Sequence, residues 1–507
     1  MITQNIIGFD LSALSEKRKY AFNPADNTPL PEAFIPSTPT EVDLAMTKAH
    51  NAWREFRIME GSRRGEFLST IADGIELLDD ILVNRMMLET AYSQARVLTE
   101  RRRTVNQLRM YAEIVVGKEW KDITIDLAIP GRMPAPRPDL RKINIGIGPV
   151  IVFAASNFPL AYSTMGGDAV SAIAAGCPVI VKSHESHLGT NALIAEVVMK
   201  AAQETGMPDG VFSSLNSDGH ETGKLLVLHP YTAAVGFTGS LSGGRALFDL
   251  ANQRPNPIPV FAEMGSVNPI FFLPGKVMQD ITSLADMLVT SMTMSVGQFC
   301  TNPGIMIALD QPNTSRLIQQ MANKLIDIPA APMLNENIAG SFHKSIATIK
   351  SNPQINLVYI SESDTLTLAS PVLATVPAKI FLSNLQLHLE VFGPFSLIVL
   401  CTDANEMLQV ANSFEGQLTA TIHCTDEEYV MASDLTKILV EKAGRIIYNG
   451  VPTGVEVCAA MNHGGPYPAS TDSRYTAVGH HAIRRWLRPV SFQDCPPELL
   501  PPDLREP

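Results

Sequence analysis

The chain has 507 residues, of which 45% are hydrophobic and 18% are charged, so it is long and apolar enough to form two or three domains. Its 39 basic and 51 acidic residues give a formal net charge of −12, which argues against a nucleic-acid binder or a membrane-surface protein. The sequence has no run of about 18 apolar residues and no signal-peptide pattern at its start, so we expect a cytoplasmic protein without a membrane partner.

The six cysteines are far apart and form no CxxC pair. This spacing indicates neither a zinc cage nor a disulfide framework, so we expect reduced thiols and no metal site. Cys177 lies in the apolar string AAGCPVIV, which is typical of core packing. Cys300 differs, because glycine, asparagine and proline surround it in the string VGQFCTNPG.

The first hundred residues are predicted to be mostly helical. One helix over 40–58 would open at Thr40, and apolar residues at spacings of three and four continue over 63–91. Four arginines are then concentrated in RRRTVNQLR, at 101–109. The following segment becomes β-branched and proline-rich, which predicts exposed strands or a protruding arm over 125–145.

Apolar strands and amphipathic helices alternate after this segment. Strands are predicted over 150–156, 178–183 and 233–240, with helices over 163–175 and 190–204. Continuous apolar strands separated by helices are typical of a parallel sheet that is covered on both faces. The fold class predicted here is therefore α/β, with a nucleotide-binding architecture.

A second α/β pattern begins near residue 260. Strands are predicted over 268–274, 303–310 and 396–403, with a helix over 282–295. Near the C-terminus, residues 484–496 read as a short strand followed by a proline-rich tail. We expect this strand to pair with the protruding arm.

Two stretches suggest a dinucleotide site. In FTGSLSGG, Gly239 and Gly244 lie between a strand and a helix, where glycine lets the backbone approach a pyrophosphate; the alternative is an ordinary strand-to-helix turn. In PVIVKSHE, Lys182 ends a strand and would donate hydrogen bonds to ribose hydroxyls; the alternative is a solvated lysine.

Two further residues suggest acyl chemistry. Glu263 lies between an apolar strand and a Gly/Ser turn, where burial would suit it to act as a general base; the alternative is a partly exposed loop glutamate. Cys300 lies in a turn near a helix end, where we expect a lowered pKa; the alternative is an inert thiol. Together with a dinucleotide site, such a thiol and base would oxidise an aldehyde through a thiohemiacetal and a thioester.

Six motifs, in their order and spacing, resemble the aldehyde dehydrogenase superfamily over essentially the whole chain. They are NFP (157–159), VIVK (179–182), FTGS (237–240), EMGSVNP (263–269), GQFC (297–300) and EVFGP (390–394). The string over 444–479, with its HGGPYPA element, is similar to the branch that contains α-ketoglutaric semialdehyde (2,5-dioxopentanoate) dehydrogenases and a bacterial NADP-dependent aliphatic aldehyde dehydrogenase.

This resemblance implies roles for individual residues. Cys300 would be the nucleophile and Glu263 the general base for deacylation, while Asn157 and the backbone N–H of Cys300 would form the oxyanion hole. The candidate cofactor-binding residues are Lys182, Glu185, Gly239, Ser240, Gly244, Glu390 and Phe392. The candidate substrate-binding residues are Arg103, Phe158, Phe299, Thr301 and His463.

Glu185 bears on the choice of cofactor, NAD or NADP. It follows Lys182 by three residues, a position where the NAD-preferring relatives often carry a glutamate. A carboxylate there would repel a 2′-phosphate by on the order of a kcal/mol. The sequence therefore favours NAD.

The resemblance also implies a domain organisation. A Rossmann-like cofactor domain would comprise residues 1–124 and 146–260, and an α/β catalytic domain residues 261–455. A β-arm for oligomerisation would comprise residues 125–145 and 484–494, so we expect a homodimer or a homotetramer.

The predicted function is NAD(P)-dependent oxidation of a small aldehyde, α-ketoglutaric semialdehyde, to 2-oxoglutarate. An arginine would hold the substrate carboxylate in a bidentate contact, with Arg103 as the candidate. The alternative is a broad or medium-chain aliphatic aldehyde dehydrogenase; a CoA-acylating enzyme is disfavoured because Glu263 is present. A remote alternative is a non-catalytic binding protein with the same fold.

Overall fold

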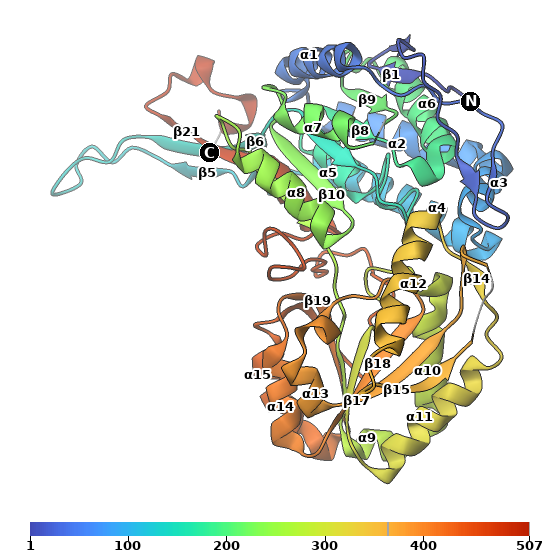
Figure 1. Cartoon of the computed structure of the whole chain (residues 1–507). Helices are drawn as coiled ribbons and strands as arrows, with labels where there is room; N and C mark the ends of the chain where they lie inside the picture. The colour runs from blue at the N-terminus through green and yellow to red at the C-terminus, as the bar shows by residue number, and fades with distance from the viewer. Residues whose placement is uncertain (218, 362–364, 506–507) are drawn as a thin grey trace.

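The computed structural model describes residues 1–217, 219–361 and 365–505. Two seven-stranded sheets, each flanked by helices, form an N-terminal and a C-terminal lobe (Figure 1). A long three-stranded arm projects from the N-terminal lobe. The α/β class predicted from the sequence is confirmed.

The N-terminal sheet has the strand order β11-β10-β7-β8-β9-β1-β2. The strands from β11 to β9 are parallel, whereas β1 pairs antiparallel with both β9 and β2. Their bounds are β1 (Asn5–Ile7), β2 (Asp10–Ser12), β7 (Val150–Phe153), β8 (Val179–Lys182), β9 (Phe212–Leu215), β10 (Ala234–Thr238) and β11 (Val260–Glu263). The strands β7, β8 and β10 confirm the apolar runs predicted in this part of the sequence.

The C-terminal sheet has the strand order β15-β17-β18-β13-β12-β19-β20 and is parallel except for β15. Its bounds are β12 (Ile270–Phe272), β13 (Ile305–Leu309), β15 (Asn356–Ile360), β17 (Val372–Pro377), β18 (Phe395–Cys401), β19 (Gln417–His423) and β20 (Ala443–Tyr448). Most side chains of β18 and all of β19 are buried, as expected for strands covered on both faces.

The N-terminal helices differ from the predicted ones at two points. Thr38, and not Thr40, caps the first helix, because its side chain accepts from the backbone N–H of Glu41 while the Glu41 carboxylate accepts from that of Thr38. The helical pattern predicted over 63–91 is divided at Leu78 into two helices. The helices of this lobe are α1 (Pro39–Phe56), α2 (Gly61–Leu77), α3 (Asp79–Thr90), α4 (Gln94–Val116), α5 (Gly167–Ala174), α6 (Leu188–Glu204), α7 (His220–Leu228) and α8 (Leu241–Asn252).

The C-terminal helices cover both faces of the second sheet (Figure 1). They are α9 (Pro274–Gln279), α10 (Ile281–Thr293), α11 (Pro312–Leu325), α12 (Glu336–Lys350), α13 (Ala378–Ser383), α14 (Ala404–Ser413) and α15 (Tyr429–Leu439). Among the helices of the described residues, none has the length and the apolar character that are needed to cross a membrane.

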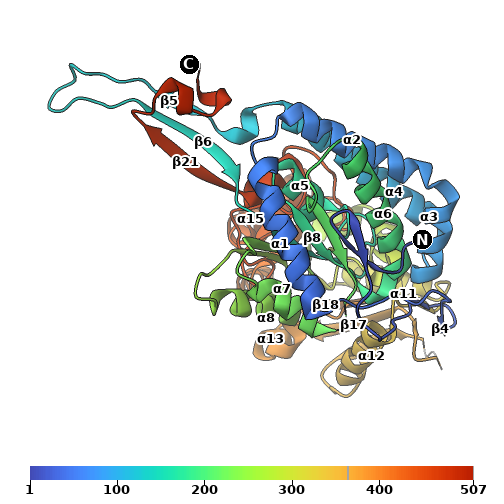
Figure 2. The same ribbon diagram turned by 90° about the horizontal axis from the view of Figure 1, so that it is seen from above.

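The arm is an antiparallel sheet of β5 (Thr124–Asp126), β6 (Leu140–Gly146) and β21 (Leu487–Gln493). It extends well away from both lobes (Figure 2). The pairing of the C-terminal strand with this segment is as predicted, but the strand begins at Leu487, because the residues before it form a 3-10 helix, η6 (His480–Trp486).

The N-terminal sheet gathers several candidate site residues at one edge. The four neighbouring strands β11, β10, β7 and β8 are parallel, so their carboxyl ends meet at the same side. Glu263 pairs with Thr238 in this register, and Lys182 pairs with Phe153. Ligands bind outside the carboxyl ends of strands in such sheets, so this edge is the expected site.

Candidate active site

Cys300 lies between η3 (Met294–Gly297) and β13, three residues after a strained end of η3. Ser295, Val296 and Gly297 have φ angles of 50°, 59° and 65°. A left-handed valine is a strained conformation, and such strain concentrates at functional sites. A Cβ on Gly297 would lie 2.2 Å from the carbonyl oxygen of Gly393, so only glycine fits this position.

Side-chain amides hold the loop around Cys300 in place. Asn268 donates from Nδ2 to the carbonyl oxygens of Cys300 and Asn302, each at 2.9 Å. Gln298 accepts from the backbone N–H of Leu334 at 3.0 Å. The position of the sulfur is therefore set by buried hydrogen bonds and not by the loop alone.

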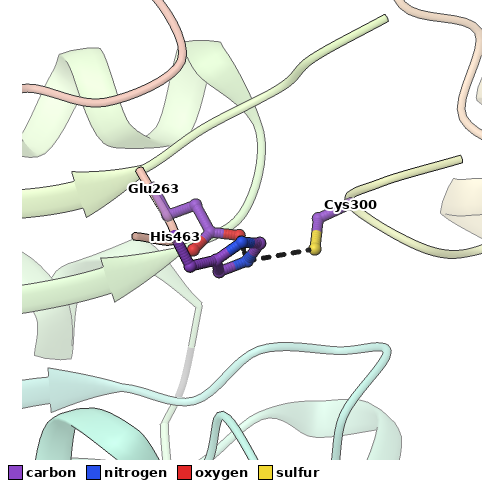
Figure 3. A group of neighbouring side chains, drawn as sticks. All are labelled: Glu263, Cys300 and His463. Carbon is purple, nitrogen blue, oxygen red and sulfur yellow. Dashed lines mark hydrogen bonds and ion pairs between the residues drawn. The ribbon is translucent and has the colours of Figure 1, made fainter. Parts of the chain in front are cut away.

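Glu263, Cys300 and His463 meet in space although they come from three separate segments (Figure 3). The Nε2 atom of His463 lies 3.0 Å from Oε1 of Glu263 and 3.6 Å from Sγ of Cys300. The side chains of His463 and Glu263 are 1% and 3% exposed. The sequence placed His463 among the substrate residues, whereas the structure places it against both the thiol and the carboxylate.

The carboxylate of Glu263 has no well-aligned hydrogen bond. Among the described residues, no donor satisfies either of its oxygens, even though His463 lies close to one of them. A buried carboxylate without hydrogen bonds has lone pairs available for a proton or another ligand.

The expected low pKa of the Cys300 thiol is not found. Burial raises its pKa well above the ordinary value, and the nearby negative charge of Glu263 raises it further, whereas Arg103 acts in the opposite direction. The reason is that the turn exposes the sulfur less than its glycine-rich sequence suggests, and that the nearest charge is negative. The thiol therefore needs a proton acceptor before it can attack.

Asn157 lies beside the cysteine loop. Its Nδ2 donates to the carbonyl oxygen of Gln298 at 3.0 Å. Its own carbonyl oxygen accepts from the hydroxyl of Tyr92 and from Nη2 of Arg96, each at 3.0 Å. These contacts fix the amide next to the turn that carries Cys300.

An aromatic wall stands next to the sulfur. The rings of Phe158 and Phe299 meet edge to face at 5.3 Å, and Phe158 also contacts Tyr162 at 5.2 Å. The Arg96 guanidinium lies 4.8 Å from the Phe158 ring and 4.4 Å from the Phe299 ring. Arg103 lies 5.3 Å from the Tyr162 ring and donates to its hydroxyl at 3.2 Å.

Sequence reasoning singled out Arg103 from the arginine run but missed Arg96 and Tyr162. A usable signal existed, because Arg96 and Arg103 are seven residues apart and so lie on one face of a helix.

Thr301 differs from the other candidate substrate residues. Its side chain is fully buried, and its hydroxyl has no partner among the residues that the structure describes.

The turn from β10 to α8 fits a pyrophosphate. Gly239 and Ser240 are exposed at the helix N-terminus, and Ser240 caps the helix by accepting from the N–H of Gly243. Free N–H groups and the helix dipole favour an anion there. Gly244 was predicted to bind the cofactor, but here it serves packing. A Cβ on Gly244 would lie 2.6 Å from the Met264 side chain, so glycine lets α8 pack closely on the end of β11.

Lys182 and Glu185 stand at the end of β8. Burial lowers the pKa of Lys182 to about 8, while the charge of Glu185 opposes this shift. The Lys182 ammonium donates to the carbonyl oxygen of Ser183 at 3.3 Å, which leaves further donor capacity for ribose hydroxyls. Glu185 is exposed.

Glu390 and Phe392 line a hollow in the C-terminal lobe together with Ser266 and Asn302. Burial raises the pKa of Glu390 to about 7, while a hydrogen bond from the Ser266 backbone opposes the shift. This hollow lies close to the cysteine loop, since Asn302 is two residues beyond Cys300. The set of donors and acceptors fits a nicotinamide ribose.

A largely parallel sheet with a glycine turn at its carboxyl edge, a partly buried thiol and a buried carboxylate define the class: a dinucleotide-dependent oxidoreductase with a cysteine nucleophile. The sequence matches the aldehyde dehydrogenase family over residues 12–489, and the chain belongs to that family. It is an NAD(P)-dependent enzyme that acts on the aldehyde group.

Two similar proteins match this chain over almost its whole length. The chain is 44% identical to α-ketoglutaric semialdehyde dehydrogenase 2 of Azospirillum brasilense, over 99% of this chain and 96% of that protein. It is 40% identical to α-ketoglutaric semialdehyde dehydrogenase of Acinetobacter baylyi, over 96% and 92%. The fold is similar to that of NAD-bound 1-pyrroline-5-carboxylate dehydrogenase from Thermus, with a TM-score of 0.83 at 20% identity, over 97% of this chain and 92% of that one.

Proposed function

We propose that the enzyme oxidises α-ketoglutaric semialdehyde to 2-oxoglutarate. The observation that carries this proposal is the pair of arginines, Arg96 and Arg103, on the aromatic wall beside Cys300. A cationic wall suits an aldehyde that carries a carboxylate. The names of the two most similar relatives reported above support the same substrate.

The chemistry begins with attack of the Cys300 sulfur on the aldehyde carbon. Because the pKa of the thiol is raised, its proton must pass to Glu263 or to water as the attack proceeds. Asn157 Nδ2 and the backbone N–H of Cys300 would stabilise the developing oxyanion. Bound NAD(P)+ supplies the hydride acceptor.

Hydrolysis of the resulting thioester needs a base. Glu263 would take a proton from the attacking water, because both of its oxygens lack a well-aligned hydrogen bond and one of them lies within 4.8 Å of the sulfur. His463 would orient this carboxylate through its 3.0 Å contact. Water attack on the thioester carbon would then release the acid and return the thiol.

Arg103 is the proposed partner of the substrate carboxylate. Nε of each arginine is buried and has no acceptor among the described residues, and each already gives one other donor, Arg96 to the carbonyl of Asn157 and Arg103 to the hydroxyl of Tyr162. Arg96 is in addition packed against the rings of Phe158 and Phe299, so we assign the carboxylate to Arg103. Phe158, Phe299 and Thr301 would shape the wall around the aldehyde end.

Replacement of Arg103 tests the proposed substrate. A hydrogen bond to a charged group contributes about 1.5–3 kcal/mol, so Arg103→Met should lower kcat/KM for α-ketoglutaric semialdehyde about 10- to 100-fold. The kcat/KM for hexanal should change little. Arg102→Met is a matched control, because Arg102 is exposed on the same helix. Equal losses with both aldehydes would contradict a carboxylate contact.

A second candidate function is oxidation of medium-chain aliphatic aldehydes. It is favoured by the apolar side chains that complete the wall, among them Val455, Val457 and Met461. Measuring kcat/KM for α-ketoglutaric semialdehyde and hexanal with the wild-type enzyme separates the two. A clear preference for hexanal would overturn the first proposal.

For the cofactor we propose a preference for NAD over NADP. Glu185 supports it, because a carboxylate near Lys182 would repel a 2′-phosphate. The exposure of Glu185 weakens this repulsion through solvent screening. A higher kcat/KM with NADP than with NAD would reverse the assignment.

We further propose a homodimer or homotetramer assembled through the arm. Its tip exposes apolar side chains, Leu127, Ile129 and Met133, which a second copy would cover. A cytoplasmic location suits the chemistry, because Cys300 must remain a free thiol and reducing surroundings keep it so. Sedimentation of the full chain measures the assembly state.

A further inference from the structure

We propose that Glu263, Cys300 and His463 also form a binding site for a thiophilic divalent cation, such as Zn²⁺ or Cd²⁺, and that its occupation switches the enzyme off. One ligand atom from each residue lies within 4.8 Å of the others. The sequence predicted no metal site, because these residues are widely separated along the chain and form no spacing motif.

The donor set selects the kind of metal. It offers one thiolate sulfur, one imidazole nitrogen and one carboxylate oxygen, which are the three ligand types that proteins use for Zn²⁺. Three protein ligands with a fourth position left for water are common around this ion. Mg²⁺ and Ca²⁺ prefer oxygen ligands, so they should bind here poorly.

The geometry is close to that of a formed site. The distances from Nε2 of His463 to Oε1 of Glu263 and to Sγ of Cys300 are 3.0 and 3.6 Å, and a cation between the three atoms would need only small side-chain rotations (Figure 3). Both oxygens of Glu263 are buried without a well-aligned hydrogen bond among the described residues, so the metal would replace only the contacts of this carboxylate with His463 and with the Cys300 thiol.

The charges balance when the metal enters. The Cys300 thiol loses its proton to solvent and the sulfur bonds to the metal, while His463 binds as the neutral imidazole through Nε2. One dication then neutralises the thiolate and the Glu263 carboxylate. This part of the inference rests on the proposed roles of Cys300 as nucleophile and Glu263 as base. Since both are ligands in this state, neither can react, and inhibition should be complete and reversible.

Direct metal binding is the decisive measurement. The full-length enzyme is treated with a chelator, kept reduced with a phosphine so that no added thiol competes, and titrated with Zn²⁺ by equilibrium dialysis. We expect one equivalent bound per chain, with activity lost in proportion and restored by EDTA. Titration with Co²⁺ should produce a near-ultraviolet thiolate-to-cobalt absorption band, which does not depend on turnover.

Variants identify the ligands. Because loss of even an outer partner lowers metal affinity about 10- to 100-fold, Cys300→Ser and His463→Gln should weaken Zn²⁺ binding at least that much. Cys300→Ser should also abolish the cobalt band. Cys458→Ser, Cys495→Ser and His481→Gln are matched controls that should bind Zn²⁺ as the wild type does. Circular dichroism and NAD binding show whether each variant is folded.

Several outcomes would overturn the proposal. One is the absence of a stoichiometric equivalent of Zn²⁺ in the folded wild-type enzyme. Another is unchanged Zn²⁺ affinity in the folded Cys300→Ser or His463→Gln variants, and a third is loss of binding in the control variants alone. None of these outcomes depends on which aldehyde the enzyme oxidises.

Discussion

At the scale of single residues, Glu263 has two opposite effects on the chemistry of Cys300. The charge of this carboxylate is the second-largest cause of the raised pKa of the thiol, after burial. The carboxylate is also the proposed proton acceptor. The two effects act at different steps. A negative neighbour keeps the resting thiol protonated, whereas in its proposed role the same carboxylate accepts a proton when water attacks the thioester.

Replacement of Glu263 should therefore change two measurements in opposite directions. In Glu263→Gln the like charge is gone, so the pKa of Cys300 falls and alkylation by iodoacetamide at pH 8 becomes faster. Steady-state turnover should fall about 10²- to 10⁴-fold, because the base is lost, while a burst of about one NADH per site remains. Glu66→Gln, at an exposed position, is the control. Slower alkylation in Glu263→Gln would contradict this account.

The lowered pKa of Lys182 predicts that cofactor binding depends on pH. Its pKa in the folded protein is lowered to about 8, so its positive charge is present at pH 7 and is lost as the pH rises through 8. The KM for NADP should rise between pH 7 and 9 more than the KM for NAD, since only NADP carries a 2′-phosphate. Lys182→Met should remove the difference between the two profiles. Parallel profiles in the wild type would count against a charged contact at Lys182.

At the scale of elements, helix ends and strand ends position the chemistry. The N-terminus of α8 presents exposed N–H groups next to Gly239, and Ser240 satisfies one of them as the cap. The same kind of cap begins α1, where Thr38 accepts from Glu41. The two caps are chemically alike, but only that of α8 stands at the proposed cofactor site.

This pair allows a matched comparison. Loss of an N-cap costs about 1 kcal/mol of stability, so Ser240→Ala and Thr38→Ala should lower the free energy of unfolding by similar amounts. Only Ser240→Ala should also raise the Kd for NAD, because of the two helix ends only that of α8 stands at the proposed pyrophosphate site. Calorimetry of NAD binding and urea unfolding measure the two effects. An equal change in NAD affinity in both variants would contradict this role for α8.

At the scale of the whole molecule, the C-terminal segment ties the arm to the N-terminal lobe. Arg485 forms an ion pair with Asp168 at 2.7 Å, and the two side chains are 3% and 9% exposed. Trp486 donates from its indole nitrogen to the hydroxyl of Ser171 at 2.8 Å. Both partners lie on α5, so the chain crosses back over that helix just before it enters β21.

Breaking this ion pair should destabilise the protein strongly. Removal of one partner from a buried pair leaves the other charge uncompensated, which costs about 3–5 kcal/mol. Arg485→Met should therefore lower the free energy of unfolding by about that amount in urea denaturation. The neighbouring Arg484 is exposed, and Arg484→Met should change stability by less than about 0.5 kcal/mol. Similar stabilities for the two variants would contradict the role assigned to the pair.

Much of the fold was predictable from local patterns. Apolar runs predicted β7, β8 and β10, and a change in composition predicted the arm. The errors lie at boundaries: the cap is Thr38 instead of Thr40, and one predicted helix is two. The boundary of an element depends on single hydrogen bonds. The element itself depends on the periodic spacing of apolar residues, which extends over many positions.

The sequence by itself determined the family, the order of the strands along the chain, the candidate thiol, and the carboxylate and lysine that stand at strand ends. Parallel strands bring their carboxyl ends together, so motifs at strand ends predict a shared site. Only the tertiary structure decided that His463, 163 residues from Cys300, lies against the sulfur and the carboxylate of Glu263. It also decided that the pKa of the thiol is raised, because burial and neighbouring charge arise from packing between segments that no local pattern relates.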